Sequence, residues 1–281
     1  MNEDMKSINE IQKDSWNKVS AAWKKWDSFT MNFLKPMGEG IIGALEIKAD
    51  DIVLDIASGT GEPAFSIAAL ATNGQVYATD LSEEMLAIAR GYAAERRINN
   101  ISFTTADVSD LPFPDNFFNK LSCRMGFMFF PDMALAAGEM FRVCKTGAKV
   151  AVSVWNLAEK NDWYTTMTKV LSRHLDLAPS SPDAPGMFRC ANQGLMQNLF
   201  EQARFKNIVV EEISGTVDFG NAENYWLNRT EISESVISLL SKTNDATREK
   251  IKEEVIRECN KNEVSKSLPM NYSSLVISAE K

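Results

Sequence analysis

The sequence lacks the features that nucleic-acid-binding and membrane proteins need. Its 281 residues carry a net charge of −8 and no cluster of lysines and arginines, so the basic surface that a phosphate backbone requires is missing. We therefore expect no nucleic-acid partner. No run of about 18 apolar residues occurs, and the charged first residues have no apolar secretory core. These absences predict a cytoplasmic protein without an integral membrane segment.

Cysteine and histidine are also scarce. The four cysteines lie far apart and form no C-x-x-C pair, so neither a zinc site nor a disulfide framework is predicted: Cys123, Cys144, Cys190 and Cys259. Cys144 continues the apolar stripe of a helix expected over 132–144. Cys123, by contrast, ends an expected strand. His174 is the only histidine.

The remaining composition suits an α/β domain. With 44% hydrophobic and 24% charged residues, the chain can bury a full core. Short apolar runs predict strands over 51–57, 75–80, 101–106, 117–123 and 148–155. Helical patterns lie between them over 61–71, 82–97 and 132–144. This alternation predicts a doubly wound, mostly parallel sheet with helices on both faces.

The segments around this core predict helical additions. Residues 1–45 are expected to form an N-terminal helical cover, because their aromatic content is too high for a solvated arm. Residues 46–156 would form the Rossmann-like core, and 157–190 a helical cap insertion with a proline- and serine-rich loop over 179–185. Residues 191–281 would complete the core through a helix over 192–203, a strand over 206–213, a helical insertion over about 222–260 and a last strand over 273–278.

The stretch from Val53 to Ala64 says most about function. It predicts a buried strand, a glycine turn and a helix, with Asp55 at the end of the strand. Gly59 and Gly61 permit a bend and a close ligand approach that a β-carbon would block. Asp80 ends the next strand, where a doubly wound sheet presents an acid to ribose hydroxyls. The pattern therefore predicts a nucleoside-binding crevice.

Two kinds of nucleoside fit this outline. The glycines with Ala64 satisfy G-x-G-x-x-A, the fingerprint of dinucleotide binding. A diphosphate at a helix N-terminus needs amides without nearby anions, whereas here Asp55 and Glu62 bracket the turn. Carboxylates repel a diphosphate but attract a sulfonium and an α-ammonium. We therefore expect S-adenosylmethionine, with an NAD(P)-dependent oxidoreductase as the alternative.

Taken in order, these motifs resemble those of class I, seven-stranded Rossmann-like S-adenosylmethionine-dependent methyltransferases, the broad group that includes the ubiquinone/menaquinone-biosynthesis C-methyltransferases. The resemblance extends over almost the whole chain and rests on residues 53–64, 76–81, 106–108, 111–113, 117–132 and 141–147. It implies a seven-stranded sheet with an antiparallel last strand. It also implies S-adenosyl-L-methionine as cofactor and S-adenosyl-L-homocysteine as product.

The resemblance further implies roles for single residues. Asp80 would bind both ribose hydroxyls, Leu81 and Met85 would pack on adenine, and Asp107 would accept from the adenine amino group. Ala106 and Val108 would lie beside the adenine. The methionine end would be held by Asp55, the backbone at Ala57, Ser58, Gly59 and Gly61, and the carbonyl region of Cys123 and Arg124. Alternatively, Asp80 and Asp107 only end strands and cap helices.

Arg124 has more than one candidate role. It could anchor the carboxylate of the cofactor or an anionic acceptor, and its simplest alternative is a salt bridge with a neighbouring acid.

The acceptor is less well defined. Aromatic and methionine side chains predict a pocket for an apolar or planar small molecule, although each would suit an ordinary core: Trp16, Trp23, Trp26, Phe29, Met128, Phe129, Trp155, Trp163, Tyr164, Met187 and Phe188. His174, on an apolar helical stripe, is the candidate base, with a core role as its alternative.

Two absences narrow the chemistry. The sequence has no N-P-P-Y or D-P-P-Y motif and no acidic metal triad. We therefore expect metal-free methyl transfer, with the target atom open among C, O, N and S. A non-catalytic S-adenosylmethionine-binding protein remains a further alternative.

Overall fold

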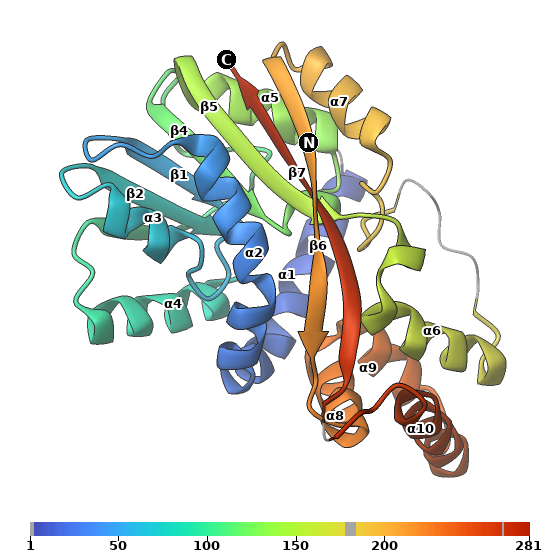
Figure 1. Cartoon of the computed structure of the whole chain (residues 1–281). Helices are drawn as coiled ribbons and strands as arrows, with labels where there is room; N and C mark the ends of the chain where they lie inside the picture. The colour runs from blue at the N-terminus through green and yellow to red at the C-terminus, as the bar shows by residue number, and fades with distance from the viewer. Residues whose placement is uncertain (1–2, 178–183, 266) are drawn as a thin grey trace.

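In the computed structural model, residues 3–177, 184–265 and 267–281 are described. They form one seven-stranded sheet in the order β3-β2-β1-β4-β5-β7-β6 (Figure 1). Strands β1 to β5 pair in parallel, and β7 runs antiparallel to both of its neighbours. The predicted doubly wound, mostly parallel sheet with an antiparallel last strand is confirmed.

The first four strands along the chain match their predicted ranges to within one residue, whereas the last three are longer than predicted. The seven are β1 (Ile52–Ile56), β2 (Gln75–Asp80), β3 (Ile101–Thr105), β4 (Phe118–Arg124), β5 (Cys144–Trp155), β6 (Lys206–Asp218) and β7 (Pro269–Glu280). The prediction left out residues 214–218 of β6 and 269–272 at the start of β7, where exposed side chains alternate with more buried ones. These residues adopt an extended conformation because β6 and β7 pair with each other along their length in an antiparallel arrangement. Cys144, predicted on a helix, instead begins β5 and is fully buried.

Half of the ten α-helices in the described ranges begin at a polar residue whose side chain caps the first turn. The ten are α1 (Glu3–Lys25), α2 (Asp27–Leu45), α3 (Ala64–Leu70), α4 (Glu83–Arg96), α5 (Met133–Val143), α6 (Asp162–His174), α7 (Gln193–Gln202), α8 (Ala222–Ile232), α9 (Glu234–Ser241) and α10 (Asp245–Asn260). Those with a capping side chain are α4, α5, α7, α8 and α10. Ser82 caps α4 by accepting from the Met85 amide. The helical segment expected over 222–260 is three helices, because Ser233 and Asn244 each begin a new one.

The predicted cap insertion over 157–190 contains less helix than expected. Residues 157–190 contain the short 3-10 helix Ala158–Lys160 and α6, which ends at His174. Residues 178–183, most of the predicted loop over 179–185, lie outside the described residues. The domain limits given above stay a prediction.

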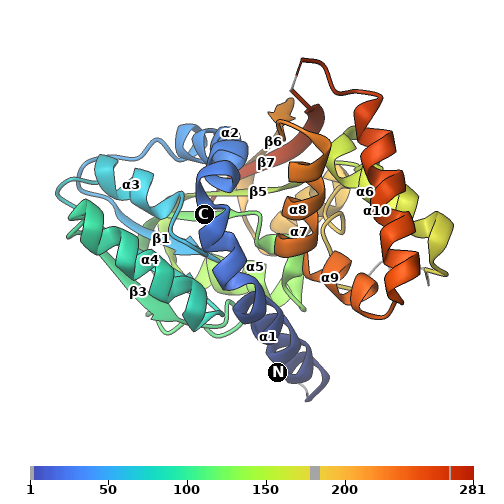
Figure 2. The same ribbon diagram turned by 90° about the horizontal axis from the view of Figure 1, so that it is seen from below.

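Helices cover both faces of the sheet. Helix α2 packs on β4, β5, β6 and β7, and α3 and α4 pack on β2 and β3, whereas α5 and α7 pack against each other and against β5, β6 and β7. Helices α6, α8 and α10 contact one another beyond the far ends of β6 and β7 (Figure 1). Helix α1 passes between α4 on one side and α8 and α9 on the other (Figure 2). No helix within the described ranges is long and apolar enough to cross a lipid bilayer.

Gly74 provides a test of this packing. A β-carbon there would lie 2.0 Å from the backbone oxygen of Asp51, which cannot move aside as a side-chain tip can. We expect Gly74→Ala to lower the free energy of unfolding by about 1 to 3 kcal/mol, as overpacking does. Gly91→Ala, on exposed α4 with no atom within 4 Å of the new β-carbon, should be neutral or stabilising. Urea unfolding of both variants measures this, and equal stabilities would contradict it.

Candidate functional site

A cavity of about 130 Å³ lies at the carboxyl ends of β1, β2 and β4, where a doubly wound sheet binds its ligands. We call it the strand-end cavity. Most of the predicted cofactor residues line it: Ala57, Ser58, Gly59, Asp80, Leu81, Met85, Ala106, Asp107, Val108 and Arg124. The parallel strands therefore bring together side chains from separate parts of the sequence.

Asp80 organises the turn beside this cavity. One carboxylate oxygen accepts from the Gly59 amide and the other from the Ser82 amide, each at 2.8 Å. Burial raises the pKa of Asp80, and these amide bonds oppose that rise. Because each carboxylate oxygen has a second lone pair, Asp80 can still accept from ligand hydroxyls.

Gly59 leaves space for a ligand. Its φ is +54°, and a β-carbon built there would meet no atom within 4 Å. The bare backbone therefore faces open cavity, which fits the predicted close approach of a nucleoside. Gly61 differs: its φ is +115°, and a β-carbon would lie 2.1 Å from the Phe65 ring. Gly61 does not line the cavity; it allows the turn to pack on α3.

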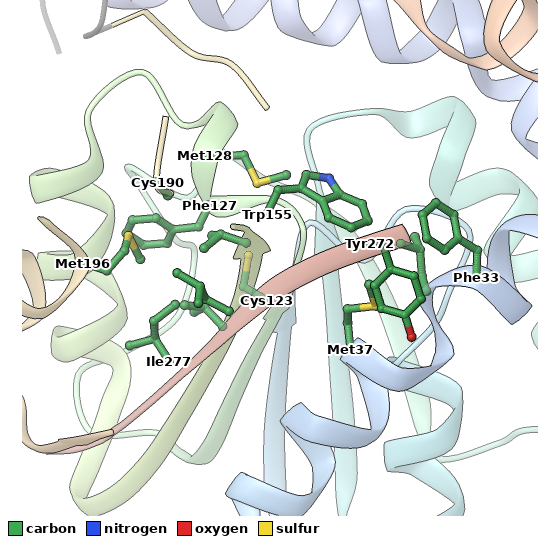
Figure 3. Close-up of a cluster of buried hydrophobic side chains, with 14 of the residues drawn as sticks. Phe33, Met37, Cys123, Phe127, Met128, Trp155, Cys190, Met196, Tyr272 and Ile277 are labelled. Carbon is green, nitrogen blue, oxygen red and sulfur yellow. The ribbon is translucent and has the colours of Figure 1, made fainter. Parts of the chain in front are cut away.

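Asp55 and Cys123 do not line the strand-end cavity. Both are fully buried and are absent from the walls of both cavities among the described residues. The predicted contacts of Asp55 and of the Cys123 carbonyl region with the methionine end stay predictions. The Asp55 carboxylate accepts from the Ser122 hydroxyl through one oxygen, and its other oxygen has no hydrogen-bond partner. Burial raises the pKa of Asp55 to about 6. Cys123 lies in the buried hydrophobic cluster (Figure 3), and burial raises the pKa of its thiol.

Arg124 extends into the strand-end cavity without a close acid. Its guanidinium donates to the Met31 sulfur at 3.4 Å, and within the described chain it forms no ion pair. Burial lowers the pKa of Arg124, while the more distant Asp55, Glu62 and Asp27 raise it. The group is therefore suited to binding a carboxylate from outside the protein.

Helix α1 closes the strand-end cavity. The Asn9 amide donates to one carboxylate oxygen of Asp107, whose other oxygen accepts from the Ser109 amide. The Ser82 hydroxyl donates to Asn17 at 2.6 Å. The sequence reading predicted only aromatic residues of this segment at the site. It missed these polar contacts because helical periodicity does not indicate which loop a helix will meet.

A second, larger cavity of about 700 Å³ lies next to the first. We call it the aromatic cavity. Ten of the predicted pocket residues line it: Trp16, Trp23, Phe29, Met128, Phe129, Trp155, Trp163, Tyr164, Met187 and Phe188. Six residues line both cavities: Gln12, Trp16, Trp23, Leu34, Met125 and Phe129. The two spaces therefore share a wall.

Two predicted residues lie elsewhere. Trp26 is absent from both walls, since its indole donates to Glu231 at 2.7 Å. His174, the candidate base, ends α6 and lies 2.6 Å from the Glu254 carboxylate on α10. The candidate base therefore lines neither cavity among the residues that the structure describes: the apolar stripe of α6 is buried, but its last turn extends past the core and pairs with α10.

The aromatic cavity also has a polar wall that the sequence reading did not predict. Thr30 of α2 and Asn228 and Arg229 of α8 line it, and all three are buried. Helix α8 lies far along the chain in what was expected to be an insertion, and only tertiary packing brings it to the cavity. Within the described ranges, no group of three or more metal-ligating side chains is positioned to hold a metal ion.

Comparison with known proteins supports the cofactor chemistry. Residues 53–147 match the family described as "Methyltransferase domain". Demethylmenaquinone methyltransferase of Thermus thermophilus is 39% identical over 109 residues, covering 39% of this chain and 49% of that protein. UbiE, the ubiquinone/menaquinone biosynthesis C-methyltransferase of Bdellovibrio bacteriovorus, is 35% identical over 144 residues, covering 51% and 61%. The chain thus spans about half the length of the curated relatives it matches.

Solved structures share the fold. The YcgJ protein of Bacillus subtilis aligns with a TM-score of 0.59 and 17% identity, over 87% of this chain and 97% of that one. Phosphoethanolamine N-methyltransferase 2 of Haemonchus contortus, solved in complex with S-adenosyl-L-methionine, aligns with a TM-score of 0.53 and 18% identity, over 87% and 52%. The matched domain, the seven-stranded sheet and the acid-lined strand-end cavity together support a class I, Rossmann-like S-adenosylmethionine-dependent methyltransferase with S-adenosylmethionine as its cofactor.

Proposed function

We propose that this protein transfers a methyl group from S-adenosylmethionine, bound in the strand-end cavity, to a small organic acceptor bound in the aromatic cavity. The observation that carries the proposal is the shared wall between the two cavities. On one side of that wall lies the strand-end cavity with the Asp80 carboxylate. On the other side lies the aromatic cavity of about 700 Å³. That volume lies within the range of small-molecule sites, about 300 to 1,000 Å³.

The residues at the strand ends would hold the cofactor, which supplies a methyl group on a sulfonium. In this proposal Asp80 binds the ribose hydroxyls, and Leu81 and Met85 contact adenine. Arg124 binds the cofactor carboxylate, because it has no acid of its own within the described chain. The carboxylates of Glu62, Asp80 and Asp107 in the cavity wall favour a cation over a diphosphate, which disfavours the oxidoreductase alternative.

Helix α1 would act as a cover over this cofactor. The strand-end cavity, at about 130 Å³, is smaller than the usual range for a ligand of this size. Side chains of α1 occupy the space, and Asn9 engages the Asp107 carboxylate that adenine would use. We infer that α1 shifts when the cofactor binds and that Asp107 exchanges Asn9 for the adenine amino group.

The acceptor would react mainly through positioning. Aromatic walls on both sides of the shared boundary exclude water and hold the acceptor in one orientation, and well-oriented groups reach effective molarities of about 10⁵ M or more. Within the described chain, His174 lines neither cavity and pairs with Glu254. The proposal therefore assigns no proton transfer to histidine.

Turnover tests the proposed function directly. The purified protein is incubated with S-adenosylmethionine and fractionated small-molecule extracts, and release of S-adenosylhomocysteine is followed by mass spectrometry. Calorimetry with S-adenosylmethionine, S-adenosylhomocysteine and NAD⁺ accompanies it. Cofactor binding with acceptor-dependent release supports the proposal. Binding without release from any fraction favours the non-catalytic alternative, and binding of NAD⁺ alone would overturn the proposal.

Asp80→Asn should weaken binding of S-adenosylhomocysteine by about 10- to 100-fold, or about 1.5 to 3 kcal/mol. The variant keeps the size of the side chain but loses a charge-assisted acceptor for the ribose. Glu84→Gln is the matched control, since Glu84 is exposed on the first turn of α4 and lines neither cavity. Calorimetry on both variants checks this, and an unchanged affinity of Asp80→Asn would refute the ribose role.

Asp55 predicts a pH dependence of cofactor affinity. Its pKa of about 6 results from burial, opposed by the Ser122 hydrogen bond. A cationic ligand nearby favours the ionised carboxylate and so lowers that pKa. Affinity should therefore be highest well above pH 6 and fall as the pH drops through the pKa of about 6 in the free protein. Calorimetry from pH 5 to 8 tests this.

Asp55→Asn supplies the comparison for that pH profile. The amide keeps the size of the carboxyl but cannot ionise, so the part of the affinity change due to Asp55 should disappear. The comparison is needed because burial also raises the pKa values of Asp27 and Asp80. Identical pH profiles for the two proteins would exclude Asp55 as an electrostatic contributor.

A further inference from the structure

Arg229 is a buried charge without an anion. It extends from α8 into the aromatic cavity and is 5% exposed. In the described chain it forms no ion pair, and its Nε has no hydrogen-bond partner. Its one marked interaction is with the Trp163 ring, whose centre lies 4.8 Å from the guanidinium carbon. The protein therefore holds a positive charge at the cavity that it does not neutralise.

Such a charge is costly unless something else compensates it. Removing a cation from water without a counterion is strongly unfavourable, and burial lowers the pKa of Arg229 accordingly. An arginine nonetheless stays protonated in proteins. The cation–π contact with Trp163 compensates only part of this cost. A ligand anion in the aromatic cavity would remove the remainder.

Neighbouring acids do not supply that anion. Glu231, on the same helix, binds Lys25 and the Trp26 indole instead. Glu234 reaches the cavity wall from the first turn of α9, but it is exposed to solvent. The second arginine of the wall, Arg189, differs because it is less buried and its two terminal nitrogens already donate to the carbonyls of Phe130 and Pro131, so that only its Nε lacks a partner. Arg229 is thus the buried guanidinium that remains for a ligand.

Two more polar groups lie in the same wall. Both amide atoms of Asn228, which is 1% exposed, lack hydrogen-bond partners, and so does the hydroxyl of Thr30, at 3%. The Trp23 indole nitrogen and the Arg189 Nε at the same cavity also lack partners. Buried polar groups are normally satisfied, so this group of unsatisfied side chains at one cavity indicates a ligand with matching polar atoms. The rest of the wall is aromatic and would contact a flat apolar body.

We propose that the methyl acceptor is a planar, mainly apolar molecule bearing a carboxylate, which Arg229 binds with help from Asn228 and Thr30. A single unneutralised guanidinium matches one carboxylate in charge and in its two-pronged geometry. This inference rests on the proposed function, because it assigns the acceptor class to the aromatic cavity. It differs from the role of Arg124, which lies in the other cavity.

The test compares a carboxylate with its uncharged analogue. Binding of 2-naphthoate and 2-naphthamide is measured without S-adenosylmethionine, by calorimetry and by quenching of the tryptophans that line the cavity. The wild-type protein should bind the acid at least about tenfold more tightly than the amide, as expected for a charge-assisted hydrogen bond. Equal affinities, or no saturable binding of the acid at millimolar concentration, would overturn the proposal.

Four variants assign the preference to its residue. Arg229→Gln should abolish the preference for the acid, and Arg229→Lys should retain part of it because the charge remains. Asn228→Asp should also abolish it, since a carboxylate in the same wall would neutralise Arg229. Arg189→Gln removes the same net charge from the same cavity and should keep the preference. Loss of the preference in Arg189→Gln but not in Arg229→Gln would overturn the assignment.

Folding and cofactor binding are monitored separately. Arg229→Gln removes an uncompensated buried charge, so its thermal midpoint should not fall below that of the wild type. Its affinity for S-adenosylhomocysteine should be unchanged, because Arg229 does not line the strand-end cavity. If the acid preference is absent while cofactor binding and turnover persist, only the acceptor class fails. If cofactor binding is absent in the wild type, the proposed function fails.

Discussion

The Asp80 carboxylate is the contact on which the cofactor site depends. It joins the turn after β1 to the start of α4 by accepting from the Gly59 and Ser82 amides. Without that bridge, two loops from separate strand ends would have no common anchor. Because the bridge uses one lone pair of each oxygen, the same carboxylate can hold the loops and bind ribose hydroxyls. One side chain would therefore serve both the structure of the turn and the proposed binding of ribose.

Two buried charges define the chemical character of the neighbouring cavities. Asp55, behind the wall of the strand-end cavity, has one carboxylate oxygen without a partner and a pKa raised to about 6. Arg229, in the wall of the aromatic cavity, has no acid beside it in the described chain. The two signs suit the two proposed ligands: a cationic cofactor near Asp55 and an anionic acceptor near Arg229. In each case the ligand would carry the opposite charge that the protein does not place beside the buried group.

Helices from both ends of the chain complete the site. Helix α1 contributes Trp16 and Trp23 to the shared wall and covers the strand-end cavity through Asn9. Helix α8 contributes the polar wall of the aromatic cavity. The matched domain over 53–147 contains neither helix. The family match therefore includes most of the strand-end cavity, whereas most of the aromatic cavity, apart from Met125, Met128 and Phe129, is built by segments that lie outside it.

Local patterns in the sequence determined the central fold and most of the residues that line the strand-end cavity. Each strand from β1 to β4 is a compact apolar run ending in polar residues, and the carboxyl ends of parallel strands meet at one edge, so Asp80 and Asp107 could be placed together. Periodicity also identified the buried stripe of α6. These predictions succeeded because hydrophobic alternation and strand polarity are properties of short segments.

Tertiary structure alone decided what depends on contacts between distant segments. It placed His174 on Glu254 rather than in a pocket, buried Asp55 behind the wall, and lengthened β6 and β7 through their pairing. It also brought Asn228 and Arg229 into the aromatic cavity. A helical pattern indicates which face of a helix is buried, but not which neighbour covers that face. For that reason the cofactor could be inferred from the sequence, whereas the acceptor pocket required the fold.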